Sequence, residues 1–227
     1  NAQLINVLNN FWLLTKKPAY KNKIYETVNW LETDMLDSSG AFYSSYDADS
    51  EGVEGKYYVW SYDEVKNILG KDFLFFNKIF NIKEDGNWEG SNVLGCYGNL
   101  HINNRDYKKL KTLIEALYQY RNNRPKPTCD NKILCDWNGL IIDSLAKSAS
   151  IFKDKKLLKL ATEAFNFIKN DMYDGSTLYH SNCNMINKHE GMLEDYAYII
   201  RAGISIFEIT NDKQYLEFSI TLSEILM

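Results

Sequence analysis

Two places in the chain put acidic side chains beside aromatic ones at the expected start of a helix. Asp136 precedes Trp137, and Glu194 and Asp195 precede Tyr196. A pair of carboxylates can act as acid and base on a glycosidic bond, and their separation then sets the stereochemical outcome. Aromatic rings beside them would offer flat apolar faces to a sugar. The candidate catalytic residues are therefore Asp136, Glu194 and Asp195. The candidate substrate-binding residues include Trp137 and Tyr196.

Each of these acids also has a purely structural interpretation. The first turn of a helix has free backbone N–H groups, and a carboxylate there accepts their hydrogen bonds and suits the helix dipole. For any one position taken alone, capping is the stronger explanation. The functional interpretation depends on the recurrence of the pattern, because repeated helix starts in a circular array converge at one mouth.

An acidic turn at 47–52, with the sequence DADSEG, is the next candidate region. It begins like a calcium-binding loop, with acids at positions one, three and five and glycine at six. Position twelve is Tyr58, where such a loop requires glutamate, and the flanking segments are typical of strands. A polar β-hairpin turn is the first alternative, and a sugar-binding loop is the second. In the sugar-binding case, Asp47, Asp49 and Trp60 are candidate substrate-binding residues.

The cysteine and histidine spacing predicts no metal site. The four cysteines form no Cys-x-x-Cys pair, and the three histidines, His101, His180 and His189, form no His-x-x-x-His pair. Motifs for nucleotide phosphates are also missing from the sequence. We therefore expect no metal, no cofactor and free thiols, which indicates a cytoplasmic location.

The composition excludes several classes of protein. With 227 residues, of which 45% are hydrophobic and 25% charged, the chain has the composition of a soluble globular protein. A net charge of −4 argues against a nucleic-acid partner. A membrane span would need a run of about 18 apolar residues, and the sequence has none.

Helical hairpins that recur along the chain must position the candidate residues. The segments 29–37 and 166–174 match each other, and short charged turns at 16–18, 153–155 and 211–213 each separate two helical patterns. These matches predict hairpins of about 36 residues. The predicted hairpins span 1–36, 136–172 and 195–227. The insertion between the first two spans 40–127 and is expected to contain a short β-hairpin.

The repeat also indicates an incomplete array. One helical hairpin cannot bury its apolar face alone, so a closed array needs more copies than three. A third copy that starts at Asp195 would extend to about residue 230. We therefore expect a fragment of one all-α domain, whose open edge a second copy of the chain or a missing N-terminal part could cover.

Several motifs, in order along nearly the whole chain, resemble the thioredoxin-domain-containing, spermatogenesis-associated protein 20 family. They are GAFYSSYDADSEG at 40–52, EGKYYVW at 54–60, GNWEG at 86–90, NVL at 92–94, RPKP at 124–127, DNKIL at 130–134, DWNGL at 136–140 and GMLEDYA at 191–197.

The resemblance implies a thioredoxin-like domain followed by a six-hairpin, glycosidase-like (α/α) barrel. The chain looks like part of that barrel alone, so the expected fold is a partial (α/α) toroid without the thioredoxin-like domain. The barrel is similar to those of sugar 2-epimerases and several glycoside hydrolases. Our hypothesis is a saccharide-binding fragment in carbohydrate metabolism, with a hydrolase or isomerase reaction if two carboxylates face each other. The alternative is a non-catalytic helical scaffold or a remnant of a larger protein.

Overall fold

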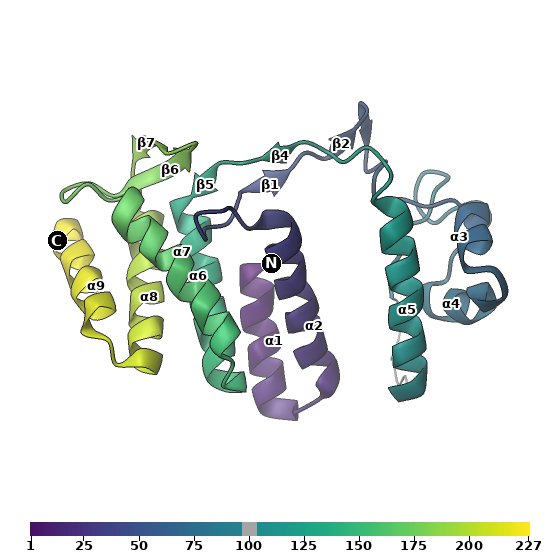
Figure 1. Cartoon of the computed structure of the whole chain (residues 1–227), viewed down its shortest axis with the longest axis horizontal. Helices are drawn as coiled ribbons and strands as arrows, with labels where there is room; N and C mark the ends of the chain where they lie inside the picture. The colour runs from purple at the N-terminus through teal and green to yellow at the C-terminus, as the bar shows by residue number, and fades with distance from the viewer. Residues whose placement is uncertain (97–103) are drawn as a thin grey trace. The chain divides into compact units, whose positions relative to one another are not determined.

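The computed structural model describes residues 1–96 and 104–227. It divides the chain into two units (Figure 1). Unit 1 consists of Asn1–Ser45 and Asp130–Met227, and unit 2 of Tyr46–Cys129. The four cysteines are free thiols. Within the described residues, no helix is long and apolar enough to cross a membrane. His101 lies outside the described residues.

Unit 1 contains three helical hairpins, which confirms the predicted helical fold class. The expected bounds, 1–36, 136–172 and 195–227, differ from the observed ones by one or two residues. The hairpins are α1 (Ala2–Thr15) with α2 (Pro18–Trp30), α6 (Cys135–Phe152) with α7 (Lys155–Asp171), and α8 (Leu193–Thr210) with α9 (Lys213–Leu226). A π-helical turn, Leu31–Met35, extends α2.

The same turn joins the two helices of each hairpin. The first helix ends at Lys16, Lys153 or Asn211, which have positive φ angles of 56°, 53° and 54°. A residue in this left-handed conformation ends a helix and satisfies one of its last carbonyls. In the second and third hairpins the next residue, Asp154 or Asp212, accepts hydrogen bonds from the first turn of the following helix. The charged turns at 153–155 and 211–213 are therefore paired helix caps.

Helix α6 is the central helix of unit 1. It packs against α1 on one side and α8 on the other, and α7 covers it within its own hairpin (Figure 1). A Cβ atom on Gly139 would lie 2.8 Å from Cβ of Tyr198 in α8. Since real Cβ atoms do not approach so closely, α6 and α8 can make this contact only because residue 139 is glycine.

A buried carboxylate on α6 joins the three first helices of the hairpins. Asp143 is 1% exposed. Its carboxylate accepts hydrogen bonds from Asn6 Nδ2 of α1 at 3.3 Å and from Ser205 Oγ of α8 at 2.7 Å. Lys147 and Arg201 form ion pairs with the same carboxylate at 2.8 and 3.2 Å. The charge of Asp143 is thus compensated by cations of α6 and α8, and α1 adds a neutral hydrogen-bond donor, as a buried charge requires.

A three-stranded antiparallel sheet lies at one end of unit 1. Its order is β5 (Ile133–Leu134), β6 (Tyr179–Cys183) and β7 (Ile186–Glu190). Strand β5 continues directly into α6, and β7 is followed after two residues by α8. The sheet therefore brings the starts of α6 and α8 to the same end of the unit.

Unit 2 corresponds to the predicted insertion, with bounds shifted by a few residues, and has a hydrophobic core of its own. Trp60, Val65, Phe73, Phe76 and Leu113 are among the buried residues of that core. Its elements are β2 (Asp49–Ser50), β3 (Val53–Glu54), α3 (Tyr62–Leu69), a 3-10 turn (Gly70–Asp72), α4 (Phe73–Phe80) and α5 (Asn104–Arg121). Strands β1 (Ser45–Tyr46) and β4 (Cys129–Asp130) pair where the chain passes between the units.

The acidic turn of unit 2 is the tip of a short β-hairpin. Asp49 pairs with Glu54 and Ser50 with Val53, and the two turn residues, Glu51 and Gly52, have positive φ angles. The segment therefore has the expected β-hairpin shape, and its role in binding a sugar stays a prediction. Of the flanking segments that are typical of strands, the one after the turn, 56–60, does not form a strand, because Tyr58 N–H bonds back to the carbonyl of Gly55 in a turn.

We predict that Asp143→Ala lowers the free energy of unfolding by about 2–4 kcal/mol, because it leaves buried donors on α1 and α8 without an acceptor. Urea unfolding followed by circular dichroism measures the loss. Glu208→Ala is the matched control, since Glu208 is exposed on α8 and its loss should change the free energy by no more than about 0.5 kcal/mol. Equal effects of the two substitutions would show that the Asp143 contacts do not hold the helices together.

Candidate functional site

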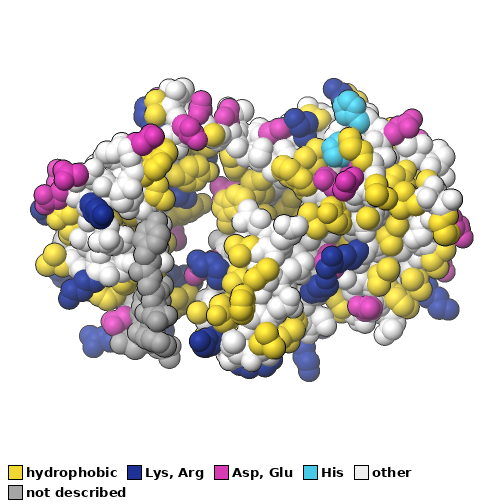
Figure 2. All heavy atoms as spheres, turned by 180° about the vertical axis from the view of Figure 1, so that it is seen from behind, with side chains coloured by type: hydrophobic (Ala, Val, Ile, Leu, Met, Phe, Trp, Pro, Cys, Tyr) yellow, Lys and Arg dark blue, Asp and Glu magenta, His cyan; other side chains and the backbone are white. Residues whose placement is uncertain are grey.

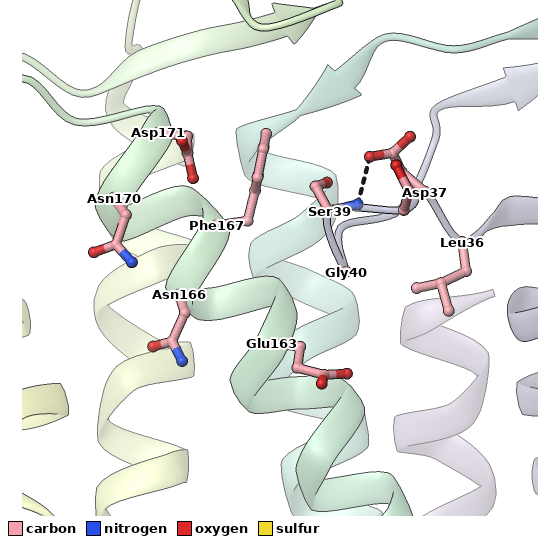
Figure 3. A pocket seen from close by; sticks show the side chains of 10 residues that line it. Leu36, Asp37, Ser39, Gly40, Glu163, Asn166, Phe167, Asn170 and Asp171 are labelled. Carbon is pink, nitrogen blue, oxygen red and sulfur yellow. Dashed lines mark hydrogen bonds between the residues drawn. The ribbon is translucent and has the colours of Figure 1, made fainter.

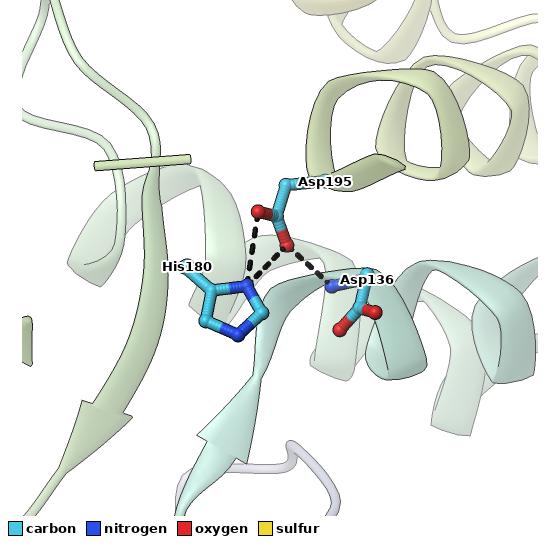
Figure 4. A group of neighbouring side chains, drawn as sticks. All are labelled: Asp136, His180 and Asp195. Atoms are coloured by element: carbon cyan, nitrogen blue, oxygen red, sulfur yellow. Dashed lines mark hydrogen bonds and ion pairs between the residues drawn. The ribbon is translucent and has the colours of Figure 1, made fainter. Parts of the chain in front are cut away.

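Three polar side chains meet where the sheet joins α6 and α8. They are Asp136 in the first turn of α6, His180 on β6 and Asp195 in the first turn of α8 (Figure 4). We call them the Asp–His–Asp cluster. One potential ligand atom from each residue lies within 4.8 Å of the others. Residues separated by up to 59 positions in the sequence are thus neighbours in unit 1.

Asp195 is the fully buried centre of the cluster. Its side chain is 0% exposed. Asp195 Oδ2 accepts a 2.7 Å hydrogen bond from Met192 N–H, and Oδ1 accepts a 2.9 Å bond from Asp136 N–H. His180 Nδ1 lies 3.1 Å from Oδ1 and 3.0 Å from Oδ2. The Asp195 carboxylate therefore caps α8, holds the first turn of α6 and orients the imidazole.

This burial corrects the expectation that Asp195 meets a substrate directly. Its oxygens face protein donors, and none of its surface is open to solvent. A carboxylate that fixes one ring nitrogen of a histidine determines which face of the ring is presented to a ligand. The Asp195 carboxylate thus holds the imidazole of His180 in place.

Asp136 is the carboxylate of the cluster that reaches the surface. It is half-buried, and its Oδ1 accepts a hydrogen bond from the N–H of Trp137 at 2.8 Å. Burial raises the pKa of the Asp136 carboxyl above its ordinary value, and the negative charge of Asp195 adds to this rise. Burial likewise raises the pKa of the Cys135 thiol, which therefore packs as a neutral group.

Sequence reasoning missed His180. Its position in the repeat corresponds to Ser44 of the first hairpin, and no histidine spacing pointed to it. Strand pairing brings His180 to Asp136, because Leu134, directly before α6, pairs with Ser181, the neighbour of His180. A sequence analysis that had predicted this pairing would have found the histidine beside Asp136.

The structure also corrects the alignment of the two helix starts. Helices α6 and α8 both have 18 residues and end in equivalent turns. Counted from those turns, the counterpart of Asp136 is Glu194, and Asp195 corresponds to Trp137. Glu194 is exposed, and Trp137 is 50% exposed. Both side chains are open to solvent, and their contact with a ligand stays a prediction.

The other two candidate rings are buried, which corrects their expected role as open platforms. Tyr196 is 7% exposed, and its hydroxyl accepts a hydrogen bond from Leu178 N–H. Trp60 is 3% exposed in the core of unit 2, where the Arg124 guanidinium lies 4.1 Å from the ring centre. Both rings stabilise the fold around them.

Asp47 and Asp49 belong to unit 2, whereas the Asp–His–Asp cluster belongs to unit 1. Both are exposed beside the β2–β3 hairpin, where Asp47 Oδ1 accepts a 3.2 Å hydrogen bond from Asp49 N–H. Their proposed contact with a substrate stays a prediction.

A separate groove of unit 1 lies between the loop after α2 and the side of α7 (Figure 3). Polar side chains line it, including Asp37, Glu163, Asn166 and Asp171. Asp37 is occupied by its own loop, because it accepts hydrogen bonds from Ser39 N–H and from the Tyr43 hydroxyl. None of the candidate residues from the sequence lies in this groove.

We predict that Asp195→Ala lowers the free energy of unfolding by about 2–4 kcal/mol, whereas Glu194→Ala changes it by no more than about 0.5 kcal/mol. The first substitution removes the cap of α8 and leaves the N–H of Asp136 unpaired; the second removes an exposed side chain one position away. Urea unfolding of both variants measures the difference. A similar loss in both variants would contradict the central role of Asp195.

The chain is similar in sequence to several curated proteins. No family model matches it. Spermatogenesis-associated protein 20 from Homo sapiens is 28% identical over a match that covers 98% of this chain, and the Rattus norvegicus protein of the same name is 29% identical over 87%. The matches cover 34% and 31% of those proteins, so the chain spans about a third of the length of its curated relatives.

Among solved structures, a glycoside hydrolase of family 105 from C. acetobutylicum matches 97% of this chain and 58% of its own. The identity is 15% and the TM-score is 0.36, which is too low to transfer an activity. The sequence matches are the broader likeness: over nearly its whole length the chain is similar to spermatogenesis-associated protein 20 of three mammals, at 27–29% identity.

Proposed function

We propose that unit 1 binds a saccharide at the surface around the Asp–His–Asp cluster and acts in carbohydrate metabolism. One observation carries the proposal: a half-exposed tryptophan, Trp137, directly follows Asp136, whose carboxylate lies beside His180. A sugar has an apolar face of C–H groups and a rim of hydroxyls, and this surface has a counterpart for each.

The apolar counterpart is the ring of Trp137. It is 50% exposed at the start of α6, although an indole ring of that size is usually more deeply buried. Met192 and Leu193, which precede and begin α8, are 56% and 66% exposed. Figure 2 shows histidine and acidic side chains among apolar ones at the end of unit 1 that carries the sheet. An exposed apolar group rimmed by polar ones is typical of a binding surface.

The polar counterpart is supplied by Asp136 and His180. Within the described part of the chain, Asp136 Oδ2 and His180 Nε2 have no hydrogen-bond partner, while Asp136 Oδ1 and His180 Nδ1 are occupied. A carboxylate oxygen accepts from hydroxyls, and an imidazole nitrogen can donate or accept. Glu194 adds a third, exposed carboxylate from α8.

The reaction class that we propose is glycoside hydrolysis or sugar isomerisation. Asp136 is the carboxylate that reaches the ligand in either class, with Glu194 as the second one, because Asp195 is enclosed by its own donors. The free cysteines favour a reducing, cytoplasmic location for this activity.

We predict that a monosaccharide or disaccharide from a broad panel raises the melting temperature of the chain. A ligand present at 100 times its Kd stabilises the folded state by about 2.7 kcal/mol if it binds that state alone. Thermal unfolding measured with each sugar identifies the ligand. Trp137→Ala and Asp136→Asn should each abolish the shift.

Two control variants accompany this measurement. Trp88→Ala removes a 38% exposed tryptophan from unit 2, and Glu208→Gln neutralises an exposed acid in the last turn of α8. Both should keep the sugar-dependent shift. A cooperative transition that no sugar moves would contradict the proposal and favour the alternative, a helical scaffold without a binding site.

A further inference from the structure

We propose that Asp136, His180 and Asp195 form a binding site for one divalent transition-metal ion. The sequence spacing predicted no metal site, because the three residues come from three separate elements. The inference concerns the same residues as the saccharide proposal, but it does not require that a saccharide binds.

The spacing of the donor atoms suits one ion. Oxygen and nitrogen ligands lie about 2.0–2.2 Å from Zn²⁺, so two ligands at the tetrahedral angle around it are about 3.4 Å apart. One donor atom from each of the three residues lies within 4.8 Å of the others. His180 Nδ1 and Asp195 Oδ2 are 3.0 Å apart in a hydrogen bond, which a bound ion would replace.

The charge of the cluster also favours a cation. Two carboxylates lie close together, one of them fully buried, and like charges at this distance repel each other. Within the described residues, the only ion-pair partner of Asp195 is His180, and no lysine or arginine pairs with Asp136. By contrast, the buried carboxylate of Asp143 is paired with both Lys147 and Arg201. A divalent ion would supply the missing positive charge.

The kind of donor selects the kind of metal. One imidazole nitrogen with two carboxylate oxygens suits Zn²⁺, Mn²⁺ or Co²⁺, whereas Ca²⁺ and Mg²⁺ prefer oxygen ligands alone. Three protein ligands leave room for water or another small ligand in the remaining positions. Asp195 is preorganised for this role, since the N–H groups of Met192 and Asp136 hold its carboxylate in place.

The test is a titration of the metal-free chain with Co²⁺ alone, followed by visible absorption, and a titration with Zn²⁺ followed by calorimetry. We expect one ion per chain in both titrations and displacement of Co²⁺ by Zn²⁺. His180→Gln and Asp136→Asn should each raise Kd about tenfold or more. His189→Gln is the matched control, because His189 is exposed on the neighbouring strand β7, and it should leave Kd unchanged.

The proposal is overturned if Co²⁺ does not bind, or if binding is equally strong in His180→Gln and Asp136→Asn. Circular dichroism of each variant establishes that it is folded, and Asp195 is left unchanged because its removal should destabilise α8. The sugar panel, run separately without metal, keeps the two proposals apart. Metal binding without any sugar-dependent shift would support the metal site and contradict the saccharide proposal. A sugar-dependent shift without metal binding would support the saccharide proposal and contradict the metal site.

Discussion

The burial of one carboxylate determines how the sheet end of unit 1 is built. A charge without solvent must be surrounded by donors, and Asp195 obtains them from α8, from the first turn of α6 and from β6. Each donor belongs to a different element, so the hydrogen bonds to Asp195 fix the positions of α6, α8 and β6 relative to one another. The surface that presents Asp136, Trp137 and His180 is a consequence of this arrangement.

The hairpin array supplies the rigidity on which that surface depends. Helix α6 lies between α1 and α8, and Asp143 in its interior is bonded to both neighbours. Binding residues at the starts of well-packed helices are held more precisely than residues on loops. The first turns of α6 and α8 carry the polar groups, while the bodies of the same helices form the core.

Local patterns in the sequence were sufficient to predict the helices. The period of the apolar residues and the charged turns at 153–155 and 211–213 located the hairpins within one or two residues, because helix caps are determined by neighbouring residues. The acids at 136 and 194–195 were also recognised, since their position at a helix start is a local property. The burial of a side chain depends instead on contacts with distant parts of the chain. In the same acid–aromatic pattern, Trp137 is exposed and Tyr196 is buried.

His180 illustrates what the sequence could not provide. Its role depends on the pairing of Leu134 with Ser181 and on the return of the chain into α8, and neither follows from residues near position 180. The same holds for Trp60, whose burial depends on the separate core of unit 2. Long-range packing decides which of several similar residues is accessible.

The contact between Gly139 and Tyr198 has a consequence for how similar chains can diverge in sequence. Gly139 lies one helical turn after Asp136, and Tyr198 one turn after Asp195, so this contact sets the separation of α6 and α8 directly below the two carboxylates. A relative with a larger residue at this position would have to space the two helices further apart, even with every polar residue retained. The size of ligand that such a relative accommodates would then be tuned by a position that never touches the ligand.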